Sequence, residues 1–390
     1  MLLSNLSLLE DDNLFDIRLA GERIQSIHPA GGSAGFTGNK GSVQFEKAIV
    51  FPGLINSHDH LDFNLFPRFG QRLYKNYREW GLEILKENKG EIEAILKIPQ
   101  ELRTRWGIYK NLLNGVTTVM NHGEKLITGR ELITVFQDYK ALHSVGFEKN
   151  WIFKLNQPFM NRGPFVIHVG EGTDINSHEE INRLIKWNIY KKDLIGIHGV
   201  AMDAIQAASF RGLVWCPDSN FFLLGKTAGI GQLQSHTKIG FGTDSSLTAG
   251  WNIWEHLRNA RKTGMVTDRR LLAMLTEEAA EVWNLKDLGK IAVGQLADMV
   301  IAKKTGSSGF DTFYSLNPDA ILMVIHKGNI RLFDESLLAQ LKPFDFPFHE
   351  FTKVQIKKSC KYVQGDLPGL LDKIVEIHKQ INLPAEISAA

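Results

Sequence analysis

The sequence predicts an α/β protein that combines a parallel, barrel-type sheet with a small β-domain formed by both chain ends. Apolar segments with the length of buried strands alternate with helical segments through the middle of the 390-residue chain. Such alternation is typical of a parallel sheet covered by helices. Several of the apolar segments end in a histidine or aspartate followed by a loop. Right-handed crossovers would bring these polar ends to one face of the sheet.

The predicted domains follow from where these patterns change. Short alternating segments near both ends predict two halves of one β-sandwich domain that pair with each other. The alternative is two separate extensions. The C-terminal region holds one predicted helix, around Leu367–Ile381. The expected parts are residues 1–50 (first half of the sandwich), 51–286 (barrel), 287–335 (second half) and 336–390 (C-terminal extension).

The first strand of the barrel segment carries His58 and His60. They end an apolar stretch that begins at Val50, and Pro52 and Gly53 allow a sharp turn into the strand. Residues two apart on a strand point to the same side, so both imidazoles can bind one metal ion. A His-x-His pair is equally compatible with a structural role, so the prediction depends on further ligands.

Later strands supply further candidates. His168 and His198 each end an apolar strand, Asp244 follows the strand that begins at Lys238, and Glu171 lies three residues past His168. Alone, a histidine at a strand end is more often a hydrogen-bonded loop residue. Together, polar residues at the C-terminal ends of barrel strands are typical of a catalytic site. The set therefore favours a metal centre.

The segments between these strands predict the helices outside the sheet. Ser177 and Glu180 have the spacing of a capping box, and apolar residues at helical spacing follow them. The other expected elements are a helix at 201–210, a strand at 212–216, a helical turn at 231–236, and helices at 251–262 and 267–283.

With these residues the chain resembles the amidohydrolase superfamily, in particular its deaminase-like branch of cytosine, guanine and S-adenosylhomocysteine deaminases and chlorohydrolase relatives. The resemblance implies a distorted (β/α)8 TIM-type barrel with a small β-sandwich domain. The motifs that carry it are His58-Asp-His60, His168-Val-Gly-Glu171, His198, Cys216-Pro-Asp-Ser-Asn220, Gly242-Thr-Asp244 and Leu288–Asp298.

The resemblance also implies the roles of these side chains. Asp244 would take the proton of the attacking water, His198 would hydrogen-bond the metal-activated hydroxide, and Glu171 would protonate a ring nitrogen of the substrate. The cofactor would be one divalent ion, with zinc preferred and iron or manganese as alternatives. The expected metal ligands are His58, His60, His168 and Asp244.

The expected function is metal-dependent hydrolysis of a non-peptide carbon–nitrogen bond, most simply deamination of a heterocyclic amine or amidine. Two alternatives stay open. One is hydrolysis of a cyclic amide or imidazolone ring. The other is a metal-binding relative that binds a small molecule without turnover, although the intact His-x-x-Glu element argues against it.

Residues 120–165 depart from the family pattern, since they are short for strands three and four with their helices. His122 and His143 lie there and are expected to be loop residues, with substrate contact as the alternative. Lys154 is the candidate for a carbamylated lysine that would bridge two metals. It lies close to His168, which leaves little room for a crossover helix, so one metal is preferred.

Tyr74, Tyr77 and Trp80 fall at near-helical spacing in the long segment after His60. Such a stripe predicts either a core face or the wall of a pocket for a flat substrate.

Two motifs of other enzyme classes are incomplete in this sequence. The stretch before Gly225-Lys-Thr227 lacks the first glycine of a phosphate-binding loop, and the two cysteines cannot form the Pro-Cys-x-x-Cys of nucleobase deaminases.

Bulk properties restrict the setting. A net charge of +2 and only short basic clusters predict no nucleic-acid partner, and no apolar run is long enough to span a membrane. Two cysteines without framework spacing, and no evident signal peptide, predict the cytoplasm. The expected partner is a small heterocyclic substrate. A homodimer is common in this family, and the sequence leaves the oligomeric state open.

Overall fold

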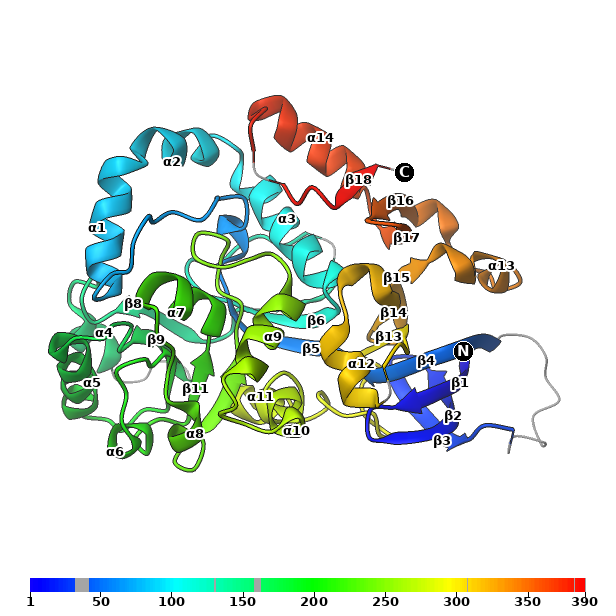
Figure 1. Cartoon of the computed structure of the whole chain (residues 1–390), viewed down its shortest axis with the longest axis horizontal. Helices are drawn as coiled ribbons and strands as arrows, with labels where there is room; N and C mark the ends of the chain where they lie inside the picture. Colours follow the sequence, from blue (N-terminus) through cyan, green and yellow to red (C-terminus); the bar gives the residue numbers. More distant parts are fainter. Residues whose placement is uncertain (32–41, 130, 158–162, 307, 382, 390) are drawn as a thin grey trace.

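The computed structural model describes residues 1–31, 42–129, 131–157, 163–306, 308–381 and 383–389. Its central feature is a set of parallel strands in a TIM-barrel-like α/β arrangement (Figure 1). One three-stranded sheet contains β5 (Leu54–Asp59), β6 (Val116–Asn121) and β7 (Thr134–Phe136). A five-stranded sheet contains β8 (Lys140–Ser144), β9 (Phe165–Val169), β10 (Leu194–His198), β11 (Gly212–Trp215) and β12 (Lys238–Phe241).

The two parallel sheets meet where the candidate ligands lie. Just past the end of β12, the backbone amides of Thr243 and Asp244 donate to the carbonyl of His58, at 3.1 and 3.0 Å. Between β7 and β8 only residues 137–139 intervene, so no crossover helix separates these strands. The departure expected at strands three and four is therefore confirmed. Among the described residues, no strand ladder joins β7 to β8 or β12 to β5.

Helices α1 to α11 lie around these strands, whereas α13 and α14 lie beside the C-terminal strands β15 (Asn329–Asp334) to β18 (Ile387–Ala389) (Figure 1). In chain order they are α1 (Tyr77–Glu87), α2 (Lys89–Leu96), α3 (Gln100–Leu113), α4 (Trp151–Leu155), α5 (Ile175–Trp187), α6 (Ala204–Ala207), α7 (Pro217–Leu224), α8 (Ile230–Leu233), α9 (Ile253–Lys262), α10 (Asp268–Ala273), α11 (Glu277–Trp283), α12 (Gly309–Ser315), α13 (Leu338–Leu341) and α14 (Leu367–Ile377). Short 3-10 turns cover Leu61–Phe63, Pro318–Ala320, Glu335–Leu337 and Phe348–Glu350.

Two helix predictions need correction. Helix α5 begins after Asp174, whose carboxylate accepts from the amide of Ser177, so Ser177 is not the cap residue. The single helix expected at 267–283 is two helices, α10 and α11. The break lets the carbonyls of Met274 and Leu275 accept hydrogen bonds from strand amides, at 2.9 Å from Phe241 and 2.7 Å from Ile55. Pairing with the barrel strands outweighs the helical propensity of this stretch.

Both chain ends build one ten-stranded sheet. Its strands are β1 (Leu2–Leu8), β2 (Asp11–Ala20), β3 (Arg23–Pro29), β4 (Ser42–Pro52), β13 (Met299–Lys303), β14 (Ile321–His326), β15 (Asn329–Asp334), β16 (Phe351–Ile356), β17 (Ser359–Gln364) and β18 (Ile387–Ala389). Strands β4 and β13 pair antiparallel with Val50 opposite Ile301. This pairing rules out two separate extensions, whereas the two-layer sandwich and the domain limits stay predictions.

The C-terminal region contains more structure than predicted. The expected helix is present as α14, but three strands, β16 to β18, extend the sheet, and the short helix α13 precedes them. The extension therefore belongs to the same sheet as the N-terminal strands.

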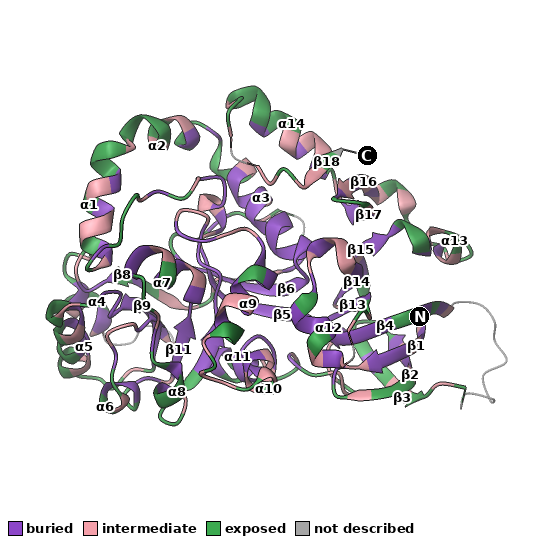
Figure 2. Ribbon diagram, viewed as in Figure 1, coloured by how far each residue is buried: buried purple, intermediate pink, exposed green. Residues whose placement is uncertain are grey.

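The middle of this sheet is buried on both faces. On β4, Ile49 and Phe51 pack into the main barrel core, whereas Val50 packs into a second core on the other face. On β13, Val300 joins the first core and Ile301 the second. This period of two is the ordinary alternation of a strand. Figure 2 shows the buried strands at the centre of the molecule and the exposed outer helices.

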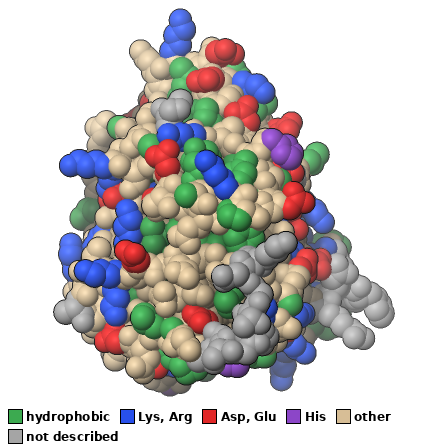
Figure 3. All heavy atoms as spheres, turned by 90° about the vertical axis from the view of Figure 1, so that its right-hand side faces the viewer, with side chains coloured by type: hydrophobic (Ala, Val, Ile, Leu, Met, Phe, Trp, Pro, Cys, Tyr) green, Lys and Arg blue, Asp and Glu red, His purple; other side chains and the backbone are tan. Residues whose placement is uncertain are grey.

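The surface on the side of the ten-stranded sheet carries Lys and Arg interspersed with Asp and Glu, with hydrophobic side chains between them (Figure 3). This mixture agrees with the small net charge of +2. No helix in the described part of the chain has the length and apolar character needed to cross a bilayer.

Candidate metal centre

Four predicted ligands come together at the carboxyl ends of three strands. His58 lies on β5 and His60 directly follows it, His168 lies on β9, and Asp244 follows β12. Their side chains are buried, apart from a partly buried His60. This placement agrees with the prediction from the sequence that the four side chains come together.

The donor atoms have the spacing that a single ion needs. Nε2 of His168 lies 3.3 Å from Nε2 of His58 and 3.4 Å from Nε2 of His60. Oδ1 of Asp244 lies 3.6 and 3.8 Å from the same two nitrogens. Ligands bonded at 2.0–2.1 Å in a tetrahedron stand roughly 3.4 Å apart. Three imidazoles and one carboxylate therefore fit one divalent cation.

A backbone contact sets His168 in the state that a metal requires. Its Nδ1 lies 2.7 Å from the carbonyl of His143, which can only accept, so Nδ1 carries the proton. The other nitrogen, Nε2, then presents a lone pair to the centre. A ring held in this way is the usual partner arrangement of metal-binding histidines.

In His198 the nitrogen Nδ1 accepts a hydrogen bond, whereas in His168 it donates one. A chain of hydrogen bonds that begins at Trp215 on β11 sets this state of His198. The indole of Trp215 donates to the hydroxyl of Thr227 at 2.6 Å, and that hydroxyl donates to Oδ1 of Asn220 at 3.3 Å. The amide group of Asn220 then donates to Nδ1 of His198 at 2.9 Å. We call these four residues the Trp215–His198 relay.

The relay leaves the proton of His198 on Nε2, which points toward the acids of the site. Nε2 lies 3.6 Å from Oε1 of Glu171 and 3.9 Å from Oδ2 of Asp244. A ring nitrogen that carries a proton donates hydrogen bonds and does not bind a metal. His198 is therefore suited to the expected role of a hydrogen-bond donor.

Asp244 is held on all sides. Its backbone has a left-handed φ of +59°, which is uncommon for a residue other than glycine. Oδ1 accepts from the amide of Ser245 at 2.8 Å, and Oδ2 accepts from the hydroxyls of Ser219 and Thr248 at 2.8 and 3.1 Å. These bonds fix the carboxylate toward the three imidazoles.

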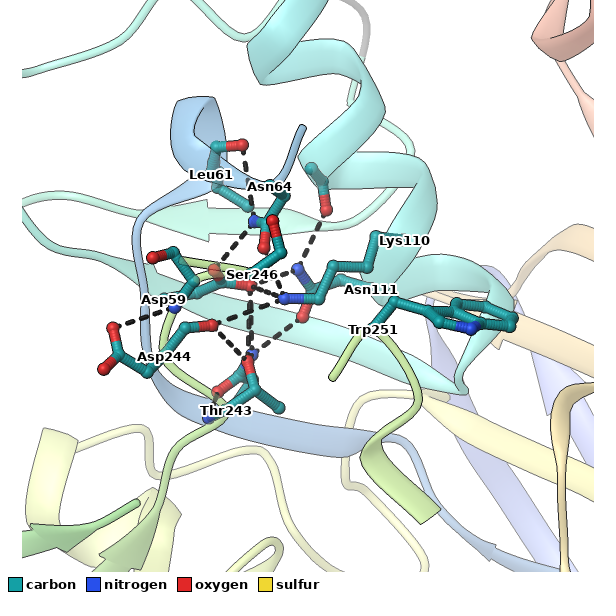
Figure 4. Close-up of polar contacts among 12 residues, drawn as sticks. Asp59, Leu61, Asn64, Lys110, Asn111, Thr243, Asp244, Ser246 and Trp251 are labelled. Carbon is teal, nitrogen blue, oxygen red and sulfur yellow. Dashed lines mark hydrogen bonds and ion pairs between the residues drawn. The ribbon is translucent and has the colours of Figure 1, made fainter. Parts of the chain in front are cut away.

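A buried polar network joins residues next to the candidate ligands (Figure 4). No sequence pattern predicts this network. Lys110 on α3 contacts Oδ2 of Asp59 at 3.2 Å, Oδ1 of Asn64 at 2.7 Å and the carbonyl of Asp244 at 3.4 Å. Asp59 also accepts from the side chain of Asn111 at 2.8 Å. The network ties α3 to both ligand-bearing segments, β5 and the loop after β12.

Burial sets the charges of the imidazoles. It lowers the pKa of His60 to about 4 and that of His198 to about 3, and it lowers the pKa of His168 well below its usual value. Neighbouring imidazoles act in the same direction. These rings are neutral near pH 7, which is the state that binds metals.

The pKa values of the two carboxyl groups of the site, Glu171 and Asp244, are shifted in opposite directions. Burial and the nearby Asp244 raise the pKa of Glu171 well above its usual value. Burial alone would raise the pKa of Asp244, but its contacts with His58, His198 and His60 hold it well below the usual range. The surroundings therefore favour the protonated form of Glu171 and the ionised form of Asp244, as expected of an acid and a base of one reaction.

The histidines of the 120–165 region are closer to the site than predicted. His122 directly follows β6, and its ring centroid lies 4.4 Å from that of His168. His143 lies on β8 and lines the cavity at the centre. The expectation that both are loop residues is wrong for His143.

Lys154 is half-exposed on α4, where it pairs with Glu148, so it cannot bridge two metals.

A cavity of about 360 Å³ opens above the centre. Tyr77 and Trp80 of the aromatic stripe line it, next to Glu171 and His198. Tyr74 instead packs in a small core with Leu223. The stripe is thus divided between the two predicted roles.

Residues 164–331 match the family model described as Amidohydrolase family. The chain is therefore similar to this family over less than half of its length. The match spans β9 to β15 and so includes His168, His198 and Asp244. Together with the deaminases described below, this match supports a hydrolase that acts on carbon–nitrogen bonds other than peptide bonds, which disfavours the alternative of a binding protein without turnover.

The curated relatives agree with this assignment. The chain is 22% identical over 404 residues to a 5-methylthioadenosine/S-adenosylhomocysteine deaminase of Desulfitobacterium hafniense. The alignment covers 86% of this chain and 91% of that protein. Most of the chain is therefore similar to this deaminase, at a low level of identity.

Solved structures share the fold. An adenosine deaminase from Xanthomonas campestris with bound zinc has a TM-score of 0.69 at 14% identity, covering 97% of this chain and 98% of that chain. An aminofutalosine deaminase from Helicobacter pylori, in complex with methylthio-coformycin, has a TM-score of 0.65 at 14% identity, covering 84% and 99%. A zinc-bound atrazine chlorohydrolase from Arthrobacter aurescens has a TM-score of 0.57 at 15% identity, covering 84% and 94%.

Proposed function

We propose that this protein deaminates a heterocyclic amine or amidine with the help of one bound zinc ion. The observation that carries the proposal is that Nε2 of His168 and Oδ1 of Asp244 each lie 3.3–3.8 Å from Nε2 of both His58 and His60. Zinc is bound by the adenosine deaminase of similar fold, and nitrogen and oxygen ligands suit this metal.

The proposed ligands are His58, His60, His168 and Asp244. A divalent ion held by them would supply a water whose pKa falls from 15.7 to roughly 7. The ligand nitrogens are neutral and the carboxylate is ionised, which is the state required for binding.

The proposed proton transfers start from an ionised Asp244 and a protonated Glu171, the forms that their surroundings favour. Asp244 accepts a proton from the attacking water, whose oxygen bonds to the ring carbon that bears the amino group. Glu171, kept protonated by burial, donates its proton to the adjacent ring nitrogen. Asp244 returns its proton to the leaving amine and the carbon–nitrogen bond breaks. The remaining hydroxyl proton passes to Glu171, which restores the acid, and ammonia and a ring carbonyl result.

His198 would stabilise the oxygen that becomes negative during the attack. The Trp215–His198 relay keeps a proton on Nε2, so the ring donates without changing its own charge. A donor fixed in advance costs no reorganisation when the charge develops.

The decisive experiment is ammonia release by the zinc-loaded protein from a panel of aminated purines, pyrimidines and triazines, which includes 5-methylthioadenosine and S-adenosylhomocysteine. Ammonia with one zinc per chain supports the proposal. Ring opening without ammonia favours the alternative, hydrolysis of a cyclic amide or imidazolone. No reaction with any member of the panel contradicts the proposal. The expected location in the cytoplasm is part of the same proposal.

A further inference from the structure

The cavity above the candidate metal centre has two different sides. Its floor carries the histidines and the acids Glu171 and Asp244. Its wall is apolar over most of its extent. The apolar side chains of this wall, which we call the apolar wall, are Phe63, Trp80, Ile84, Leu85, Phe147 and Leu247.

The apolar wall is held in place by contacts outside the cavity. The indole nitrogen of Trp80 donates to the carbonyl of Phe69 at 2.6 Å, which fixes the ring. Beside it, the hydroxyl of Tyr77 accepts from the amide of Gly146 at 3.0 Å and lies 3.3 Å from a carboxylate oxygen of Glu180. The hydroxyl of Tyr77 is therefore engaged behind the cavity.

The charges at the cavity are all acidic. Among the described residues that line it, none is a lysine or an arginine. Arg72, which precedes α1, is paired with Glu79 and Glu83 of that helix at 2.9 and 2.6 Å. A carboxylate or phosphate on the substituent of a ligand would lose water against the apolar wall and meet no lysine or arginine there, which is costly.

Resting on the proposed deamination, we propose that the substrate is an aminated heterocycle that carries an uncharged apolar substituent, such as an alkyl, thioether or aryl group. The amino group lies over the acids and histidines of the floor, and the substituent lies against the apolar wall. The reaction consumes water and releases ammonia, and the substituent is unchanged. The wall selects against substituents that end in a carboxylate or phosphate.

The test compares substrates that differ only in charge. Adenines that carry a butyl or a carboxypropyl group on the ring nitrogen that bears the sugar in nucleosides are one pair, and amino-triazines with the same two groups are the second. The kcat/KM for the butyl compounds should exceed that for the carboxypropyl compounds at least about tenfold. Equal values, or a preference for the carboxylate, would overturn the inference.

A charge added to the apolar wall should reverse this preference. Leu85 and Leu82 are both exposed leucines of α1, with 61% and 66% of their side chains accessible, but only Leu85 lines the cavity. Leu85→Arg should raise kcat/KM for the carboxypropyl compound about tenfold and lower it for the butyl compound. Leu82→Arg should leave both values unchanged. An equal gain in the two variants contradicts a role of the wall.

Calorimetric binding of the same pairs separates this inference from the proposed function. If no compound of either pair releases ammonia, the proposed deamination of these rings fails. The wall is still tested, because the butyl compound should bind at least about tenfold more tightly than the carboxypropyl compound. Equal binding overturns the preference whatever the reaction turns out to be.

Discussion

The amide nitrogen of Asn220 lies 2.9 Å from Nδ1 of His198, and this contact decides which ring nitrogen of His198 faces the centre with a proton. Asn220 has its own orientation fixed, since its Oδ1 accepts from Thr227, whose oxygen accepts from Trp215. Both Asn220 and His198 are buried, so no water can replace the bond. Asn220 of α7, which is not one of the proposed metal ligands, thus sets the tautomer of His198.

Asn220→Asp should impair turnover more than binding. A carboxylate accepts where the amide donates, so it would draw the proton of His198 to Nδ1 and remove the donor on Nε2. We expect kcat to fall by about 10²-fold, as for the loss of one oxyanion donor, with a smaller change in KM. Nitrogen NMR of labelled histidine should show the altered tautomer in the metal-free protein. Asn329→Asp, at an exposed position of β15, should change neither. An unchanged His198 signal in Asn220→Asp would contradict the relay.

Glu171→Gln should leave the zinc content intact and lower kcat by about 10²–10⁴-fold, the usual contribution of a positioned acid or base. The amide keeps the shape of the side chain but cannot transfer a proton. Zinc analysis and ammonia release measure the two effects. Glu179→Gln, on the exposed face of α5, is the matched control and should behave as the wild type. Full activity of Glu171→Gln would remove Glu171 from the mechanism.

Zinc should stabilise the folded protein. An ion that binds only the folded state adds about 2.7 kcal/mol at a free concentration of 100 times its Kd. Thermal unfolding with and without zinc should show this increase, and His168→Ala and Asp244→Asn should abolish it. His28→Ala, at an exposed position of β3, should retain it. Two equivalents of zinc per chain would contradict the single-ion centre.

Lys110→Met should destabilise the protein by about 3–5 kcal/mol, because it leaves the fully buried Asp59 without its cation. Urea unfolding measures the change. Lys89→Met removes an exposed ion pair with Glu93 and should change the free energy of unfolding by less than about 1 kcal/mol. Similar losses in both variants would show that the buried network contributes little.

Glu180 should make stability depend on pH. Burial raises its pKa from 4.5 to about 7, against the hydrogen bond from the amide of Gly170. The folded state therefore holds a proton that the unfolded state has lost, and this contribution to stability falls as the pH rises from about 4.5 to about 7. At 1.36 kcal/mol per pKa unit the loss is about 3 kcal/mol.

Glu180→Gln should remove that contribution, since the amide does not ionise. The difference in unfolding free energy between wild type and Glu180→Gln should change by roughly this amount between pH 4.5 and 7.5. Glu179→Gln, its exposed neighbour, should track the wild type at every pH. A constant difference between wild type and Glu180→Gln would show that Glu180 has an ordinary pKa in the folded protein.

The convergence of the strand-end candidates could be predicted from the sequence because their signals are local. An apolar strand that ends in a polar residue and a loop is visible in about ten residues, as at His168 and His198. Parallel strands joined by right-handed crossovers then bring such ends to one face without further information. The alternation of buried residues on β4 and β13 is likewise local, so the shared sheet was predictable.

Other features depended on contacts between distant parts of the chain. Lys110 is an ordinary lysine within a helical segment, and only packing places it against the carbonyl of Asp244, 134 residues later. The break between α10 and α11 follows from strand amides that lie more than thirty residues away in the sequence. His143 was assigned to a loop because its short strand has no distinctive pattern.

The sequence by itself therefore determined which strand ends carry candidate ligands, and that these ligands offer nitrogen and oxygen donors to a divalent ion. Tertiary structure decided the protonated nitrogen of His198, the buried cation behind Asp59 and the apolar wall of the cavity. The physical reason is how far apart in the sequence the interacting residues lie. Strand period and ligand type are properties of neighbouring residues, whereas tautomers, buried ion pairs and cavity walls are set by side chains that meet only after the chain has folded.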